Sequence, residues 1–240
     1  MKHIPQLILD SSLPYLEDLA REVGEVTTLA SRDFSPERVG QADALLIRSV
    51  VHCDAALLSG SRVRMIATAT AGYDHIDGAC DAAGIAWRNA PGCNAGGVVQ
   101  YVLSSLAAWS LERGVDLEGL TLGIVGVGHV GGRLAERASA LGLRVLLCDP
   151  PRAEREGGEG FLPLLEQSDI VTLHVPLIRA GRYATVGMVA EGFLEHCSRR
   201  PLLINACRGG VAPTAQLLRG LESGRLRDLI LDCWEGEPEI

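Results

Sequence analysis

Several features that would point to particular classes of protein are missing from this sequence. Aromatic residues make up only 4% of it, and no apolar run approaches the ~18 residues of a membrane-spanning helix. The net charge of −8 argues against a surface for nucleic acid. The start, MKHIPQLILD, lacks the charged, apolar and cleavage-site regions of a secretory signal. We therefore expect a cytoplasmic protein with an aliphatic core that binds neither nucleic acid nor a membrane.

The cysteines and histidines give no metal or disulfide pattern. The seven cysteines form no C-x-x-C pair and are odd in number, and the six histidines show no ligand spacing. Most of the cysteines lie in apolar runs or beside loops, as reduced core cysteines do. The sequence predicts neither a metal site nor a disulfide framework.

What the sequence does contain is a regular alternation of strand-like and helix-like segments. Short apolar runs such as DALLI at 43–47 alternate with amphipathic stretches, and no hairpin signal separates them. This rhythm predicts an α/β protein with two parallel-sheet domains. We expect a flavodoxin-like substrate domain over residues 1–93 and a Rossmann-like dinucleotide-binding domain over 94–240. The helix expected over 98–111 is apolar nearly all round, which predicts burial between elements or between subunits.

The most informative stretch runs from Leu122 to Pro150, LGIVGVGHVGGRLAERASALGLRVLLCDP. An apolar strand leads into G-x-G-x-x-G at the start of a helix. Gly126 permits a tight turn, Gly128 lets a pyrophosphate approach bare backbone, and Gly131 lets the helix pack on the strand. Asp149 follows the next apolar run at about the ~20-residue interval of an acid that binds ribose hydroxyls. The pattern predicts an NAD site.

Some local expectations can be checked directly against a structure. Ser35 and Pro36 are typical of a helix N-cap and first helical position. Residues 54–58 are expected to be helical, and the polar stretch 150–159 is expected to be a loop.

Chemically useful residues gather just past the ends of predicted strands, where open α/β sheets bind their ligands. They are Ser49, Thr70, the glycine turn, Asp149, His174, Arg208, Asp232 and Glu237.

The residues in this group have competing interpretations. The planar fork of Arg208 suits a carboxylate, the alternative being a structural ion pair. Glu237 could orient a catalytic imidazole or could be a solvated loop acid. His174 fits packing beside a cofactor better than proton donation. Ser49 and Thr70 could hold a phosphate or carboxylate, or simply form turns.

Several segments resemble the D-2-hydroxyacid dehydrogenase family: GIVGVGHVG, LLCDPPR, LHVPL, INACRGG and LDCWEGEP. The segments LLIRSV, ATATAGYDHID, APGCNA and LLCDPPR are most similar to members that oxidise a phosphorylated 2-hydroxy acid in pyridoxine (pyridoxal phosphate) biosynthesis. The resemblance implies NAD-linked oxidation at C2. It implies that Arg208 holds the carboxylate, that Glu237 pairs with a catalytic histidine, and that Ser49 and Thr70 contact substrate. The cofactor-binding residues that it implies, together with the glycine pattern, are Gly126, Gly128, His129, Val130, Gly131, Asp149, Val175, Ala206, Cys207, Arg208 and Asp232.

The chain also departs from the family pattern. The family's catalytic histidine lies on a strand beyond the E-P motif, so we expect a C-terminally truncated chain that lacks it. The segment returning to the first domain and the C-terminal dimerisation module are expected to be missing too. Val175 replaces the usual threonine, and Pro213-Thr214 replaces the usual acid. We expect a homodimer for the full-length form, and weak NAD binding without turnover for this fragment.

Four alternatives stay open on the sequence. Arg152 could accommodate the 2′-phosphate of NADP. The chain could be an NAD-binding corepressor-like protein without catalysis, or a dehydrogenase of another 2-hydroxy acid. A methyltransferase using S-adenosylmethionine fits the paired motifs less well.

Overall fold

The chain divides into two compact units, Met1–Asn94 and Ala95–Ile240. This is a computed structural model, and it describes residues 3–156 and 161–237. Across those described ranges, no helix combines the length and the apolar character that crossing a membrane requires. Each unit is described by itself.

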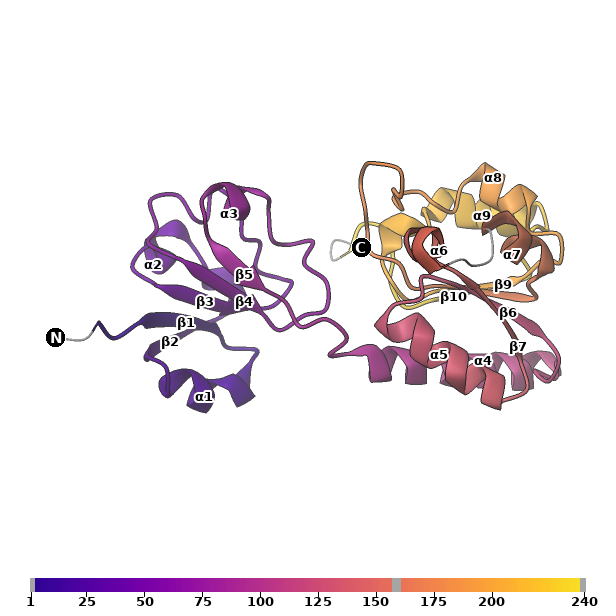
Figure 1. Cartoon of the computed structure of the whole chain (residues 1–240), viewed down its shortest axis with the longest axis horizontal. Helices are drawn as coiled ribbons and strands as arrows, with labels where there is room; N and C mark the ends of the chain where they lie inside the picture. Colours follow the sequence, from indigo (N-terminus) through magenta and orange to yellow (C-terminus); the bar gives the residue numbers. More distant parts are fainter. Residues whose placement is uncertain (1–2, 157–160, 238–240) are drawn as a thin grey trace. The chain divides into compact units, whose positions relative to one another are not determined.

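The first unit is built on a five-stranded parallel sheet with the order β2-β1-β3-β4-β5 (Figure 1). Its strands are β1 (Gln6–Asp10), β2 (Glu25–Leu29), β3 (Ala44–Ile47), β4 (Met65–Thr68) and β5 (Ala86–Arg88). This is the flavodoxin-like order, with its switch point between β1 and β3. The sequence-based fold prediction for this half is confirmed.

Short helices cover the two faces of this sheet. They are η1 (Pro14–Leu16), α1 (Glu17–Arg21), η2 (Ser31–Asp33), α2 (Pro36–Val39) and α3 (Ala79–Ala82). The Ser35 side chain accepts a hydrogen bond from the Arg38 N–H, which confirms the predicted cap of α2. The helix predicted over 54–58 is wrong. Asp54 instead accepts from the Leu57 N–H within a run of turns that ends at Gly60, whose φ is +65°. The bond from Leu58 N to Asp54 O is followed by a bond from Ser59 N to Ala56 O, so the helical hydrogen-bond pattern does not continue.

The second unit has a parallel sheet with the order β7-β6-β8-β9-β10. Its strands are β6 (Thr121–Val125), β7 (Arg144–Cys148), β8 (Ile170–Leu173), β9 (Leu202–Asn205) and β10 (Asp228–Leu231). Counted within each unit, the two sheets have the same strand order. The switch point of this sheet lies between β6 and β8.

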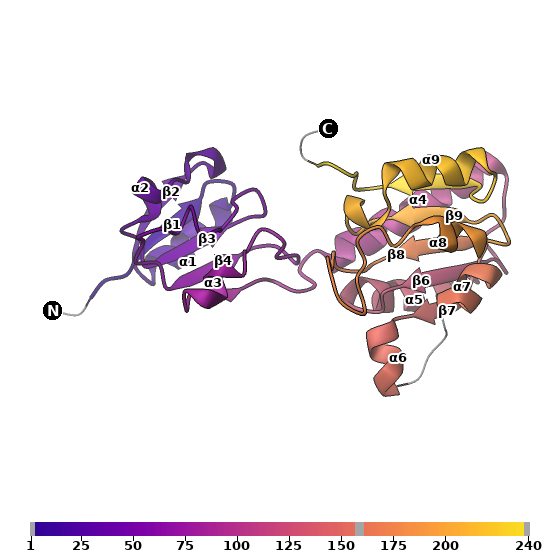
Figure 2. The same cartoon turned by 90° about the horizontal axis from the view of Figure 1, so that it is seen from above.

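Helices flank both faces of this second sheet (Figures 1 and 2). On one face lie α4 (Ala95–Arg113) and α5 (His129–Ala140), and on the other lie α7 (Phe161–Gln167), α8 (Glu191–Glu195) and α9 (Thr214–Glu222). Successive β6 side chains therefore enter different cores. Leu122 and Ile124 pack with α4 and α5, whereas Val125 packs with α7 and α8. This two-sided burial explains why the strands are continuous apolar runs.

The loop predicted over 150–159 is wrong where the structure describes it, because helix α6 spans Pro150–Glu156. Asp149 acts as its N-cap, since a carboxylate oxygen accepts from the Arg152 N–H at 3.1 Å. Pro150 follows at the first helical position, which its fixed φ suits. The polarity of the stretch masked this capping signal. Residues 157–159 lie outside the described residues.

Helix α4 is longer than predicted and is buried on one side only. Val102 and Leu106 are buried against the sheet, while Leu111 is 85% exposed and Ala107 and Ala108 also face outward. An apolar composition all round therefore does not mean burial all round within this unit.

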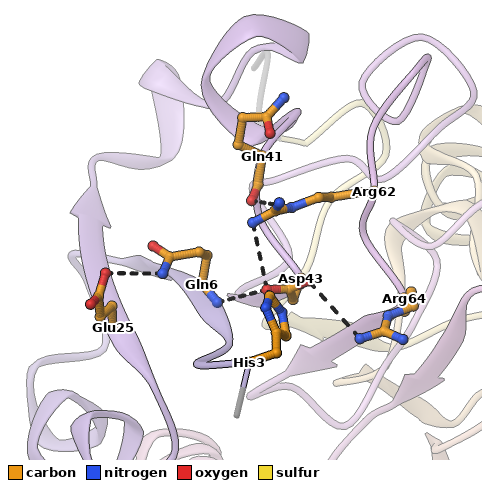
Figure 3. Close-up of polar contacts among 7 residues, drawn as sticks. All are labelled: His3, Gln6, Glu25, Gln41, Asp43, Arg62 and Arg64. Carbon is orange, nitrogen blue, oxygen red and sulfur yellow. Dashed lines mark hydrogen bonds and ion pairs between the residues drawn. The ribbon is translucent and has the colours of Figure 1, made fainter. Parts of the chain in front are cut away.

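A charged cluster lies at the amino-terminal edge of the first sheet (Figure 3). The buried Asp43 carboxylate accepts from the Gln6 N–H at 2.8 Å and pairs with His3 at 3.0 Å. Arg62 and Arg64 lie 3.7 and 4.0 Å from its oxygens. The hydrogen bond from Gln6 N lowers the pKa of Asp43, against the opposing effect of burial, with His3 and Arg62 adding to the lowering. Ligands of such sheets bind at the other edge, so we interpret this cluster as structural.

Candidate functional site

The glycine turn after β6 has the backbone that a dinucleotide-binding turn requires. Gly126 has a φ of +92°, and a Cβ there would lie 2.4 Å from the His174 carbonyl oxygen and 3.0 Å from a Val175 methyl group. A Cβ on Gly131 would lie 2.0 Å from the Gly126 carbonyl oxygen. Both positions therefore exclude any side chain, for the two reasons that the sequence pattern predicts.

Gly128 differs from its two partners because nothing lies within 4 Å of where its Cβ would be. It is exposed and immediately precedes α5. The first hydrogen bond across this turn runs from Gly132 N to Gly128 O, so the N–H groups of His129, Val130 and Gly131 precede it. Free N–H groups and the positive end of the helix dipole suit a pyrophosphate beside bare backbone. The turn therefore fits the pyrophosphate of the dinucleotide that the sequence predicts.

Asp149 ties the end of β7 to the glycine turn. One carboxylate oxygen accepts from the Val127 N–H at 2.9 Å, and the other accepts from the Arg152 N–H. Each oxygen keeps a further lone pair, so the carboxylate can still accept from ribose hydroxyls. The residue is half-buried, and its position beside the turn fits an adenosine ribose.

His174 comes directly after β8 and is held at the switch point by its backbone N–H, which donates to Val125 O at 2.7 Å. Its Nε2 lies 2.9 Å from the Thr172 hydroxyl, and its buried Nδ1 has no hydrogen-bond partner among the described residues. Burial lowers its pKa to about 4. The ring is therefore neutral at pH 7, which favours the packing interpretation over proton donation.

The segment after β9 carries Ala206, Cys207 and Arg208 around a buried asparagine. Asn205 is fully buried, and its Nδ2 donates to the Arg208 carbonyl oxygen at 3.0 Å. Its Oδ1 accepts from the Cys207 N–H at 3.3 Å, and the Cys207 thiol lies 3.1 Å from the same atom. Arg208 is half-buried and donates to the Cys207 carbonyl oxygen at 2.7 Å. One amide thus sets the backbone that carries the guanidinium.

The turns after β9 and β10 pack directly on each other. A Cβ on Gly209, in the short helix η3 (Gly209–Val211), would lie 1.9 Å from the Trp234 carbonyl oxygen. Asp232 is exposed, and its N–H donates to Asn205 O at 2.9 Å. Glu237 is also exposed, and its carboxylate accepts from the Trp234 N–H at 2.8 Å. The structure thus brings the Arg208 turn and the Glu237 turn together. The pairing of Glu237 with a histidine stays a prediction.

The thiols beside Arg208 are poor nucleophiles. Burial raises the pKa of Cys207, and burial raises that of Cys233 to about 12. The thiolate is the reactive form, so these cysteines do not point to covalent chemistry. All seven cysteines of the chain are free, and the described residues form no cluster that could hold a metal ion.

In the first unit, the predicted substrate residues lie at the ends of neighbouring strands. Ser49 is exposed two residues past β3, and the half-buried Thr70 lies two residues past β4. The strands are in register, with Ile47 opposite Thr68, and the Ala69 N–H donates to Ile47 O at 2.9 Å. The two hydroxyl residues therefore share one edge of one sheet.

Sequence reasoning missed two residues that lie beside the candidate site residues. Asn205 supports the Arg208 turn, and its signal was a lone amide ending the otherwise apolar run LLIN. Arg48 follows β3 directly, and among the described residues its exposed side chain forms no ion pair and no hydrogen bond. The sequence signal for Arg48 is the same as that for Arg208, because each is an arginine just past a buried strand.

Comparison with known proteins gives a family match. Residues 103–240 match the family described as D-isomer specific 2-hydroxyacid dehydrogenase, NAD binding domain. Among curated proteins, the erythronate-4-phosphate dehydrogenase of Porphyromonas gingivalis is 50% identical over 98% of this chain and 65% of its own length. That of Bacteroides thetaiotaomicron is 45% identical over 98% of this chain and 69% of its own. The chain thus spans about two thirds of the length of these relatives.

Solved structures with the same fold include a cofactor (NAD+)-bound 3-phosphoglycerate dehydrogenase from Entamoeba histolytica. Its TM-score is 0.82 at 24% identity, covering 98% of this chain and 82% of that one. A D-lactate dehydrogenase from Aquifex aeolicus in complex with NAD and lactic acid has a TM-score of 0.78 at 23% identity, and the match covers 97% of this chain and 78% of that one. At these identities the likeness shows the fold alone.

Proposed function

The chain belongs to the D-isomer specific 2-hydroxyacid dehydrogenase family, and from that premise we propose that it serves NAD-dependent oxidation of 4-phospho-D-erythronate to the 2-oxo acid. The 45–50% identity to erythronate-4-phosphate dehydrogenases supports this substrate. The corresponding process is pyridoxine biosynthesis.

The observation that carries the proposal is the order of motifs along one sheet edge. The glycine turn and His174 occupy the β6–β8 switch point, and Arg208 follows β9, the next strand. A dinucleotide site and a carboxylate-binding arginine on neighbouring strand ends are what hydride transfer from a 2-hydroxy acid needs, because both reactants must be held together.

Each residue of this edge has a proposed part. Bound NAD would supply the hydride acceptor. The N–H groups at the start of α5 would hold the pyrophosphate, and Asp149 would accept from ribose hydroxyls. Arg208 would bind the substrate carboxylate with two parallel N–H donors and so hold C2 in position for hydride transfer. His174 is a poor base for the alcohol proton because its pKa is about 4.

The phosphate of this substrate needs a second cation, and we propose Arg48 with Ser49. Both follow β3 at the β1–β3 switch point of the first sheet, beside Asp10 at the end of β1. Burial opposes ionisation of Asp10, but hydrogen bonds from Ser12 and Ser31 and the charge of Arg48 together lower its pKa. The Asp10 oxygens are engaged by those serines, which leaves the Arg48 fork available to an anion.

Asp149 supports NAD over NADP, because a 2′-phosphate would meet its negative charge. Titration calorimetry should show NAD binding more tightly than NADP. Asp149→Asn should narrow that difference while preserving α6, because asparagine also caps helices well. Equal affinity of the unaltered chain for both nucleotides would contradict the assignment.

The substrate proposal is tested with Arg208→Lys, which keeps the charge but removes the planar fork. Calorimetry in the presence of NADH should show 4-phospho-D-erythronate binding at least about tenfold more weakly to this variant. NAD affinity should change little. Unchanged binding of the acid, or tighter binding of another 2-hydroxy acid, would overturn the proposal. Slow or absent turnover by residues 1–240 stays a prediction, and NADH absorbance measures it.

Two further proposals concern the oligomeric state and the cellular location. We propose a homodimer for the longer protein, supported by the exposed apolar residues of α4, and light scattering would test it. We propose a cytoplasmic location, supported by the free thiols of all seven cysteines, and cell fractionation would test it.

A further inference from the structure

A chain of hydrogen bonds runs through the first unit to Thr70. His75 Nε2 lies 2.8 Å from the Thr68 hydroxyl, which lies 2.8 Å from the Thr70 hydroxyl. The Thr70 hydroxyl in turn donates to the Gly72 carbonyl oxygen at 2.8 Å. His75 and Thr68 are 5% and 4% exposed, whereas Thr70 is half-buried at the sheet edge. The chain therefore connects the interior with the candidate substrate site.

The direction of every bond follows by elimination. A carbonyl oxygen only accepts, so the single Thr70 proton is committed to Gly72 O. Thr68 must then donate its own proton to Thr70, and so His75 Nε2 must donate to Thr68. The loop that carries Gly72, where this series of hydrogen bonds ends, is held in place because the Asn89 side chain donates to Ala71 O at 2.7 Å.

This direction decides what Thr70 can offer a ligand. A hydroxyl has one proton and two lone pairs. The proton is used by Gly72 and one lone pair by Thr68, so only a second lone pair is left. Thr70 can accept from a ligand hydroxyl, but it has no proton for a phosphate or carboxylate oxygen.

We propose that Thr70 accepts a hydrogen bond from the C3 hydroxyl of the substrate, and that Thr68 and His75 are positioning residues that set its polarity. This rests on the proposed substrate, 4-phospho-D-erythronate. Of its hydroxyls, the one on C2 must give up its proton in the reaction, whereas the C3 hydroxyl keeps its proton and needs a lasting acceptor. The anionic groups of the substrate need cations, whereas the free lone pair of Thr70 suits a hydroxyl group, so Thr70 would discriminate in favour of an acid that carries a hydroxyl on C3.

The donor-to-acceptor direction of the hydrogen bonds from His75 to Thr70 is tested without any ligand. Long-range ¹H–¹⁵N correlation spectra of the 240-residue chain should show a proton on His75 Nε2, with the signal assigned from His75→Gln. Thr68→Ser keeps the hydroxyl and should preserve this state. Thr68→Val has the same shape without the hydroxyl and should change the His75 signals. An unprotonated Nε2 in the unaltered chain, or identical His75 signals in Thr68→Val, would overturn the direction.

The role of Thr70 is tested by calorimetry with NADH present, using 4-phospho-D-erythronate and its 3-deoxy analogue. Thr70→Val should weaken binding of the hydroxylated acid about tenfold and that of the analogue by less than about twofold. His75→Gln should bind the hydroxylated acid as the unaltered chain does, because its amide N–H can still donate to Thr68, whereas His75→Leu should not.

The two measurements separate the possible failures. If Thr70→Val lost the same binding affinity for both acids, the proposed hydrogen bond between Thr70 and the C3 hydroxyl would be refuted. If the unaltered chain bound neither acid, the proposed substrate and the Thr70 assignment would fall together, while the NMR result would still decide the direction of the chain.

Discussion

The neutral, half-buried His174, whose Nδ1 atom is buried, makes the stability of the second unit depend on pH in a predictable way. Its pKa is about 4 in the folded chain, against an ordinary value of 6.5. Between these values the unfolded chain binds a proton that the folded chain refuses, so stability falls as the pH falls from about 6.5 to about 4. At about 1.4 kcal/mol per pKa unit, the full effect is about 3.5 kcal/mol. About 2 kcal/mol of it should already be lost between pH 7 and pH 4.5.

The measurement is urea unfolding at several pH values, followed by Trp109 fluorescence in a Trp87→Phe, Trp234→Phe background. Trp109 is buried in α4 and so reports on the second unit. His174→Gln is the control, because glutamine can still bond to the Thr172 hydroxyl but does not titrate. Carboxylates affect both proteins alike, so the difference between the two curves isolates His174. Parallel loss of stability in both proteins from pH 7 to pH 4.5 would refute the burial argument.

Three further predictions concern the glycine turn, the Arg208 support and the amino-terminal charge cluster. Gly131→Ala should destabilise the second unit by roughly 1–3 kcal/mol in urea titrations and weaken NAD binding, because its Cβ meets backbone at 2.0 Å; Gly132→Ala, with nothing within 4 Å, is the matched control and should not destabilise. Asn205→Asp loses the donor to the Arg208 carbonyl and should cost about 1–3 kcal/mol of stability, with weaker binding of the acid by calorimetry; unchanged binding would exclude Asn205 as a support. Asp43→Asn should lower the melting temperature of the first unit at pH 7 and have little effect near pH 2, because a carboxylate with a lowered pKa stabilises only while ionised; scanning calorimetry at both pH values checks this, and an equal loss at both would contradict it.

Much of the fold could be predicted because it depends on local patterns. Apolar runs without hairpin signals predict parallel strands, and both sheets have that form. One segment for which the prediction was wrong follows a residue that serves two purposes. Asp149 fits a ribose-binding acid and also caps α6, so the polar residues after it predict a loop although they form a helix. Residues 54–58 have helix-forming composition but form turns, because the backbone enters the left-handed region at Gly60, two residues later.

Some residues of the candidate sites could likewise be predicted from local patterns, and others could not. Gly126, Gly128 and Gly131 could be assigned roles from their spacing, since a strand, a tight turn and a helix are consecutive along the chain. Asn205 and Arg48 were missed, because their importance depends on which neighbouring strand ends lie beside them.

The sequence by itself determined the family resemblance, the α/β architecture and the position of the dinucleotide turn, because all three depend on residues close together along the chain. Only the tertiary structure decided the neutral state of His174, the support of Arg208 by Asn205, and the direction of the chain from His75 to Thr70. Each of these depends on burial or on a donor and an acceptor meeting in space. The polarity of a hydroxyl is set by its neighbours, and spacing along the sequence does not specify them.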